Sequence, residues 1–208
     1  MKIGIMGGTF DPIHNGHLHL ARTALTQFDL DQIWFMPNGM PPHKKQSSIE
    51  SDIHERIAMT QIAIKANKQF YLQEYEAKRE KVSYSYKTME HFRKIYPDDE
   101  FYFIIGADSL FSIETWKHPE RLFKACIILA ACRDEAATKE SLNGQIQMLK
   151  GKYGAYIKFL AMPLEHVSSH EIRKLIESGE PVSEYIPAEV EAYIRKEGLY
   201  GSGNRKNQ

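Results

Sequence analysis

Two histidines stand three residues apart in the stretch 7-GGTFDPIHNGHL-18, directly after a short apolar run. The glycines that open this stretch would let a ligand approach the backbone closely. Asn15 or a neighbour can cap the helix that follows, and the first turn of a helix attracts anions through its unpaired N–H groups and its dipole. His14 and His17 would then offer two imidazole donors to a phosphate group. The alternative interpretation is a tight turn with one capping histidine.

A second stretch, 163-PLEHVSSHEIR-173, offers a similar chemistry. Ser168 and Ser169 would place hydroxyl and N–H groups at the start of a helix, and Arg173 would add a planar charged fork one turn on. Such a helix start is suited to hold the phosphate tail of a nucleotide. The same letters also form a capping box, in which a serine caps the helix and Glu171 lies in its first turn.

The stretch 104-IIGADSLFSIETW-116 combines a carboxylate with an indole after an apolar run. Gly106 and Asp108 would lie where a strand ends, and the carboxylate could accept a hydrogen bond from a ribose hydroxyl. Asp108 could instead be only a helix N-cap. Trp116 could stack on a flat, electron-poor ring such as a pyridinium, or it could pack as a core aromatic.

These residues need a scaffold, and the hydrophobic pattern predicts an α/β fold. Apolar runs alternate with helical periodicity, which is typical of a doubly wound, Rossmann-like parallel sheet with helices on both faces. In such sheets, ligands bind beyond the carboxyl ends of the strands. The predicted strands cover residues 2–7, 32–37, 70–73, 101–106, 125–132 and 156–162. The predicted helices begin near residues 16, 51, 84, 137, 169 and 187, with Ser51 as a cap, Pro187 as a first helical residue and Gly198 as a C-cap.

Length and composition limit the classes of protein that the chain can belong to. The 208 residues favour one domain, which we place at 1–200, followed by a tail at 201–208 that should be disordered. Lys and Arg balance Asp and Glu at 27 each, so no global field attracts nucleic acid or anionic lipid. No apolar run approaches the roughly 20 residues that span a bilayer, and no signal peptide is apparent. Cys126 and Cys132 predict buried thiols in a reducing cytoplasm.

Two common nucleotide motifs are missing from the sequence and a third is present. Neither G-x-x-x-x-G-K-[ST] nor G-x-G-x-x-G occurs, which argues against a P-loop enzyme and a nicotinamide dehydrogenase. The HNGH of residues 14–17, placed after G-G-T-F-D-P, resembles the H-x-G-H motif of the nucleotidyltransferase superfamily. The whole string looks most like the bacterial nicotinate-nucleotide adenylyltransferases. This resemblance implies transfer of the adenylyl group of ATP to nicotinate mononucleotide, with release of pyrophosphate, in NAD biosynthesis.

The resemblance also implies roles for particular residues. The catalytic set would be His14, His17, Arg173 and Lys44, the last in a loop that resembles the P-P-H-K loop of the family. The residues that would bind ATP are Gly7, Gly8, Thr9, Phe10, His17, Gly106, Asp108, Ser168, Ser169, Ile172 and Arg173. The residues that would bind nicotinate mononucleotide are Lys44, Ser83, Tyr84, Ser85, Thr88 and Trp116. Mg²⁺ would be carried by the ATP phosphates, and no side chain is assigned as a metal ligand.

The chain departs from the family pattern at several positions, so other functions stay open. His170 replaces the usual threonine of the I-S-S-T-x-I-R element, and Lys87 replaces an acidic residue, with further differences at Lys81, Val82 and Ser85. The alternatives are adenylyl transfer to nicotinamide mononucleotide or another phosphate acceptor, and a non-enzymatic nucleotide-binding regulator. A class I aminoacyl-tRNA synthetase is disfavoured because the chain has no K-M-S-K-S-like loop and no room for a tRNA-binding domain. Folds of this kind often self-associate, so a homodimer is one expectation.

Overall fold

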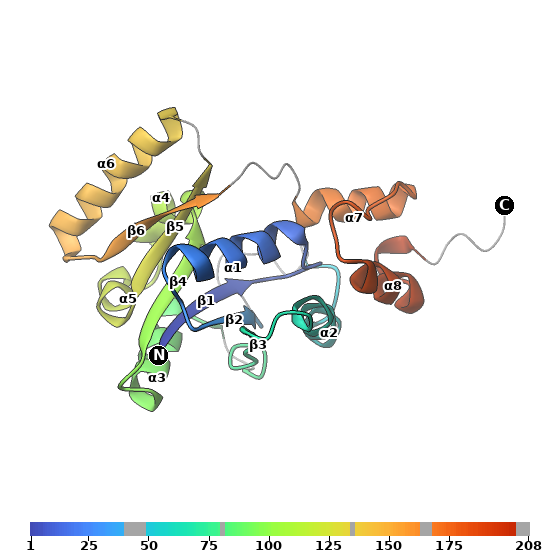
Figure 1. Cartoon of the computed structure of the whole chain (residues 1–208), viewed down its shortest axis with the longest axis horizontal. Coiled ribbons are helices and arrows are strands. Elements are labelled where there is room, and N and C mark those ends of the chain that lie inside the picture. Colours follow the sequence, from blue (N-terminus) through green and yellow to red (C-terminus); the bar gives the residue numbers. More distant parts are fainter. Residues whose placement is uncertain (40–48, 80–81, 134–135, 163–167, 203–208) are drawn as a thin grey trace.

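A computed structural model describes residues 1–39, 49–79, 82–133, 136–162 and 168–202. Within these ranges the chain forms a parallel six-stranded sheet with the strand order β3-β2-β1-β4-β5-β6 (Figure 1). The strands are β1 (Lys2–Gly8), β2 (Gln32–Pro37), β3 (Phe70–Leu72), β4 (Glu100–Gly106), β5 (Ile127–Arg133) and β6 (Ile157–Met162). The strand order reverses between β1 and β4, so the carboxyl ends of these two strands border the crevice in which such sheets bind ligands.

Helices cover both faces of the sheet. One face carries α1 (Asn15–Gln27), α2 (Ile53–Ile64), α7 (Ser169–Ser178) and α8 (Ala188–Glu197), whose apolar side chains belong to one core cluster. The other face carries α3 (Ser85–Ile95), α4 (Ala107–Ser112), α5 (Pro119–Ala125) and α6 (Ala136–Tyr153), whose apolar side chains belong to a second cluster. The short turns η2 (Ile113–Thr115) and η3 (Leu199–Gly201) complete the described elements. The predicted doubly wound α/β sheet is therefore confirmed.

The six predicted strands are present, and the differences concern helix ends and short helices. The cap of α2 is Asp52 and not Ser51, because the Asp52 carboxylate accepts the Glu55 N–H at 2.9 Å while Glu55 bonds back to the Asp52 N–H. Pro187 is the N-cap of α8 and not its first residue, whereas Gly198 closes that helix with a φ of 68°, as predicted. Three short elements between β4 and β5 (α4, η2 and α5) were not predicted.

Three further expectations concern the two cysteines, membrane-spanning segments and the tail at 201–208. Cys126 and Cys132 are buried, as predicted. No helix among the described residues is long and apolar enough to cross a membrane. Gly201 is the last residue of η3, and residues 203–208 lie outside the described ranges. The predicted boundary between domain and tail therefore stays a prediction.

Candidate active site

A cavity of about 390 Å³ opens where the strand order reverses, beside the carboxyl ends of β1 and β4. It lies between the start of α1 on one side and the segment that leads into α3 on the other. The predicted site residues that line it are Gly7, Gly8, Thr9, His17, Ser83, Tyr84, Ser85, Gly106 and Trp116. Segments far apart in the sequence thus meet in one cavity, and they include residues assigned to both substrates.

The two histidines of the HNGH string occupy different positions at the start of α1. His14 is the N-cap, and its backbone N–H donates to Nδ1 of His17 at 3.2 Å. A ring nitrogen that accepts a hydrogen bond carries no proton, so the neutral His17 ring has its proton on Nε2. His17 lines the cavity, and the two ring centroids are 3.8 Å apart. The N-cap interaction therefore fixes which nitrogen of His17 can donate to a ligand.

His14 is held in its neutral form by burial. Its side chain is 8% exposed, and this burial lowers the pKa of His14 to about 4. Asn15 or a neighbour was predicted to cap this helix; the cap is the neighbour His14, and Asn15 is the first residue of α1. Its backbone N–H donates to Tyr185 O at 2.8 Å and its side chain to Glu184 O at 3.0 Å. The start of α1 is therefore attached to the segment that precedes α8.

Gly8, the second glycine of the pair before the histidines, is required by packing as well as by access. A Cβ at Gly8 would lie 2.8 Å from the ring of Phe10, which is 1% exposed. Phe10 was predicted to bind ATP, but its ring is part of the core and does not line the cavity. It has a φ of 50° and meets His17 edge-on, with 5.1 Å between the ring centroids. Phe10 therefore supports His17 from the core side.

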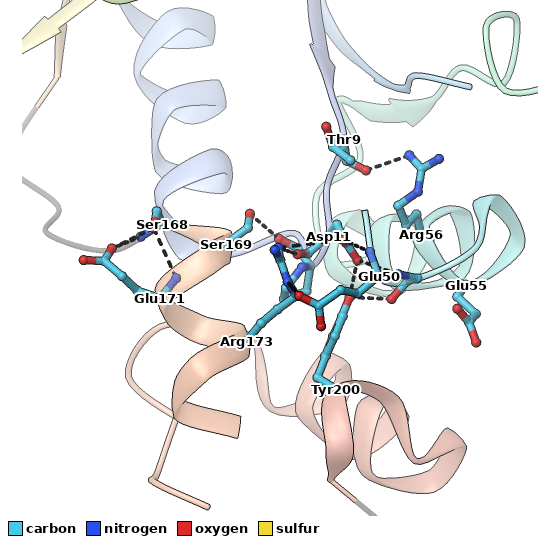
Figure 2. Close-up of polar contacts among 12 residues, drawn as sticks. Thr9, Asp11, Glu50, Glu55, Arg56, Ser168, Ser169, Glu171, Arg173 and Tyr200 are labelled. Carbon is cyan, nitrogen blue, oxygen red and sulfur yellow. Dashed lines mark hydrogen bonds and ion pairs between the residues drawn. The ribbon is translucent and has the colours of Figure 1, made fainter. Parts of the chain in front are cut away.

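The start of α7 lies against the loop that carries His14, as Figure 2 shows. Ser168 caps the helix and exchanges hydrogen bonds with Glu171, so the capping-box interpretation is confirmed. Ser169 Oγ donates to Pro12 O at 2.9 Å. Arg173 is 9% exposed, and its guanidinium donates to Asp11 O and to a Glu50 carboxylate oxygen, each at 2.7 Å.

Several predicted site residues do not line the cavity. Ser168, Ser169 and Arg173 are not among its lining residues, and Ile172 is fully buried in the core. Asp108 is exposed in the first turn of α4, whose N-cap is Gly106, so the alternative of Asp108 as an N-cap is excluded and its assignment to ATP stays a prediction. Lys44 lies outside the described residues.

The acceptor side of the cavity is formed by the start of α3 and by Trp116. Ser83 and Tyr84 precede α3 and Ser85 is its first residue, while Trp116 is half-buried with its ring centroid 6.4 Å from that of Phe103. Thr88, predicted here, does not line the cavity itself but bonds a residue that does. It is 2% exposed and donates to Glu76 Oε1 at 2.7 Å.

Comparison with known proteins identifies the family. Residues 5–175 match the model of the cytidylyltransferase-like family. The chain belongs to this family. It is 40% identical to a probable nicotinate-nucleotide adenylyltransferase of Clostridium kluyveri over 96% of this chain and 99% of that protein. A relative of the same name from Carboxydothermus hydrogenoformans is 43% identical over 96% of this chain and 98% of that protein.

The chain also has the same overall fold as a solved structure. The chain is similar to the nicotinic acid mononucleotide adenylyltransferase of Plasmodium falciparum complexed with NaAD. The TM-score is 0.74, with 22% sequence identity over 96% of this chain and 97% of that chain. At this identity the likeness concerns the fold alone.

Three residues of this cytidylyltransferase-like site were missed by the sequence analysis. Glu76 lines the cavity, and burial raises the pKa of its carboxyl group. Lys117 also lines the cavity and places Nζ 5.0 Å from the Tyr84 ring centroid. Arg56 is 2% exposed and donates through Nη1 to Thr9 O and Asn38 O, at 2.9 Å each, which joins the ends of β1 and β2. Of the three, only Arg56 could have been noticed in the sequence, because it is a charged residue between the apolar residues of a predicted helix.

The described residues that line the cavity offer few side chains that could bind a metal ion directly. Glu76 is the one carboxylate among the described lining residues, and it is engaged with Thr88. Within the described part of the chain, no three His, Cys, Asp or Glu side chains are grouped so that they could hold a metal ion. A divalent cation that enters with nucleotide phosphates and water fits this donor set better than a resident ion.

Proposed function

We propose that this chain is a nicotinate-nucleotide adenylyltransferase, which joins ATP to nicotinate mononucleotide and releases pyrophosphate. The observation that carries the proposal is the shared cavity: the oriented His17 ring and Trp116 line the same space. One residue suits a nucleotide phosphate and the other a flat pyridine ring. Relatives that carry this enzyme name match 96% of the chain at about 40% identity, which supports the same conclusion.

The proposed reaction is an in-line displacement. An oxygen of the acceptor 5′-phosphate forms a bond to the α-phosphorus of ATP, and the bond from that phosphorus to the bridging α,β-oxygen breaks, so pyrophosphate leaves. The attacking phosphate is already ionised at neutral pH, so no general base is needed. Catalysis then consists of positioning and of stabilising the charge that develops on the phosphate oxygens.

We assign each part of this task to residues on the cavity or next to it. His14 and His17 act at the oxygens around the α-phosphorus, with His17 donating from Nε2. Arg173 is held by Asp11 and Glu50, so we assign it a fixed positive charge near the pyrophosphate, together with the start of α7. Lys44 is assigned to the incoming phosphate by the family resemblance. Ser83, Tyr84, Ser85 and Trp116 are assigned to the nicotinate mononucleotide.

The remaining assignments follow from this reaction. Mg²⁺ enters as part of the ATP substrate and neutralises its triphosphate. The enzyme acts in the cytoplasm on small molecules, without a nucleic acid or membrane partner. The expected homodimer is tested by analytical ultracentrifugation. Residues 1–200 are proposed as the catalytic domain.

One assay tests the proposed function. Pyrophosphate release from MgATP is measured with nicotinate mononucleotide, nicotinamide mononucleotide and phosphopantetheine as alternative acceptors. We expect release with nicotinate mononucleotide, slower release with the amide and none with phosphopantetheine. A faster reaction with the amide would favour the alternative acceptor, and no release with either pyridine mononucleotide would contradict the proposal.

A further inference from the structure

The loop between β1 and His14 is held by three segments that are distant in sequence (Figure 2). The Asp11 carboxylate is 2% exposed and accepts the backbone N–H of Glu50 at 2.8 Å and that of Ser51 at 3.2 Å. The start of α7 bonds the backbone of the same loop through Arg173 and Ser169. The third segment is the turn η3, near the far end of the chain.

The contact from η3 is made by the hydroxyl of Tyr200. This hydroxyl donates to Asp11 Oδ1 at 2.7 Å and accepts from Ser51 Oγ at 2.6 Å. The three side chains therefore form one continuous series of hydrogen bonds, in which Ser51 donates to Tyr200 and Tyr200 donates to Asp11. Tyr200 is 9% exposed, and burial raises the pKa of its hydroxyl, which therefore remains a donor.

The backbone of Tyr200 is strained in a way that suits this contact. Its φ of 54° lies in the left-handed region, which is unfavourable for a non-glycine residue. Such strain persists where the surroundings determine the conformation, as they do here through two buried hydrogen bonds and packing against the core. The left-handed turn brings the phenol ring to Asp11, 189 positions earlier in the chain.

We infer that Tyr200 is a positioning residue of the active site. Its hydroxyl holds the Asp11 carboxylate, and Asp11 fixes the loop that ends at His14. His14 in turn fixes His17 through the hydrogen bond to Nδ1. A small displacement of His17 would move its Nε2 away from the phosphate, and a misplacement of 1 Å can cost two orders of magnitude in rate. The inference rests on the proposed function for its effect on rate.

The test compares two substitutions at this hydroxyl. Tyr200→Phe removes both of its buried hydrogen bonds, the one donated to Asp11 and the one accepted from Ser51. Ser51→Ala removes only the bond from Ser51, so the difference between the two variants isolates the bond to Asp11. For Tyr200→Phe we expect kcat to fall about tenfold with the KM values for both substrates changed by less than about twofold. For Ser51→Ala we expect kcat within about twofold of the wild-type value. Both variants are assayed well below their Tm values, so that the loss of stability does not enter.

The outcomes separate positioning from a purely structural role. Equal losses of kcat in the two variants, or an unchanged kcat in Tyr200→Phe, would overturn the inference. If the wild-type chain released no pyrophosphate, the proposed function would fail, and NMR of ¹⁵N-histidine would still test the inference. We expect Tyr200→Phe to shift the ring signals of His14 and His17, and Ser51→Ala to leave them in place. Unshifted signals in Tyr200→Phe would contradict it.

Discussion

At the scale of single residues, His14 and His17 differ in environment although only two residues separate them. His14 is a buried N-cap with a lowered pKa, and His17 lines the cavity with its proton placed on Nε2. The sequence indicates both histidines by their spacing, but it does not say which one is buried. That difference depends on the core packing of the loop that Phe10 and Asp11 form, which is a long-range property.

We expect His17→Ala to leave the fold intact and to lower kcat by at least about 100-fold, as for the loss of one preorganised donor. His19→Ala is the matched control, since His19 is exposed on the same helix. Steady-state pyrophosphate release measures both variants, and circular dichroism checks the fold. Wild-type turnover in His17→Ala would contradict the assignment.

The buried His14 predicts a pH dependence of stability. In the unfolded chain His14 gains a proton as the pH falls below about 6.5, whereas in the folded chain it does so only near pH 4. The unfolded state therefore binds more protons between these values, and the free energy of unfolding decreases as the pH falls from about 6.5 to 4. Above pH 6.5 this contribution is constant.

Urea unfolding at pH 7 and pH 5 measures this contribution as a difference between variants. The wild type should lose about 2 kcal/mol more than His14→Gln over this interval, since 1.5 pH units correspond to about that free energy. His54→Gln, at an exposed position of α2, should lose as much as the wild type. An equal loss in wild type and His14→Gln would show that burial does not hold His14 neutral.

At the scale of elements, the sequence predicts the strands well because most are continuous apolar runs and β6 is interrupted only by Lys158. It predicts α4, η2 and α5 poorly because each has seven residues or fewer, too short for a helical period to show. Pro119 at the first position of α5 was the available signal. Ser51 was expected to cap α2, but its hydroxyl bonds Tyr200, and Thr88 was expected in the cavity, but it bonds Glu76. Neither partner can be read from local sequence.

Gly8 and Gly144 give opposite predictions for the same substitution. Gly8→Ala places a Cβ 2.8 Å from the buried Phe10 ring, so we expect the free energy of unfolding to fall by about 1–3 kcal/mol. Gly144→Ala lies within α6, where a Cβ has no neighbour within 4 Å, so we expect a gain of about 0.5–1 kcal/mol. Urea denaturation checks both. A neutral Gly8→Ala would mean that Phe10 can move, and that its support of His17 is weak.

At the scale of the whole molecule, the proposal that Mg²⁺ binds only together with ATP can be tested by removing the ion. If the ion enters only with ATP, EDTA should abolish pyrophosphate release and leave the Tm of the ligand-free protein unchanged. Excess Mg²⁺ should restore the activity fully. A fall in the Tm on addition of EDTA would indicate a resident metal ion, and the assignment of the ion to the ATP phosphates would then be wrong.

The bond between Tyr200 and Asp11 also limits when the loop before His14 can gain its full set of contacts. Asp11 is translated 189 positions before the residue that secures it, which corresponds to about 10 to 40 s at ordinary rates of synthesis. By then all six strands have been translated. The contact between Tyr200 and Asp11 can therefore form only after every strand of the sheet has been translated.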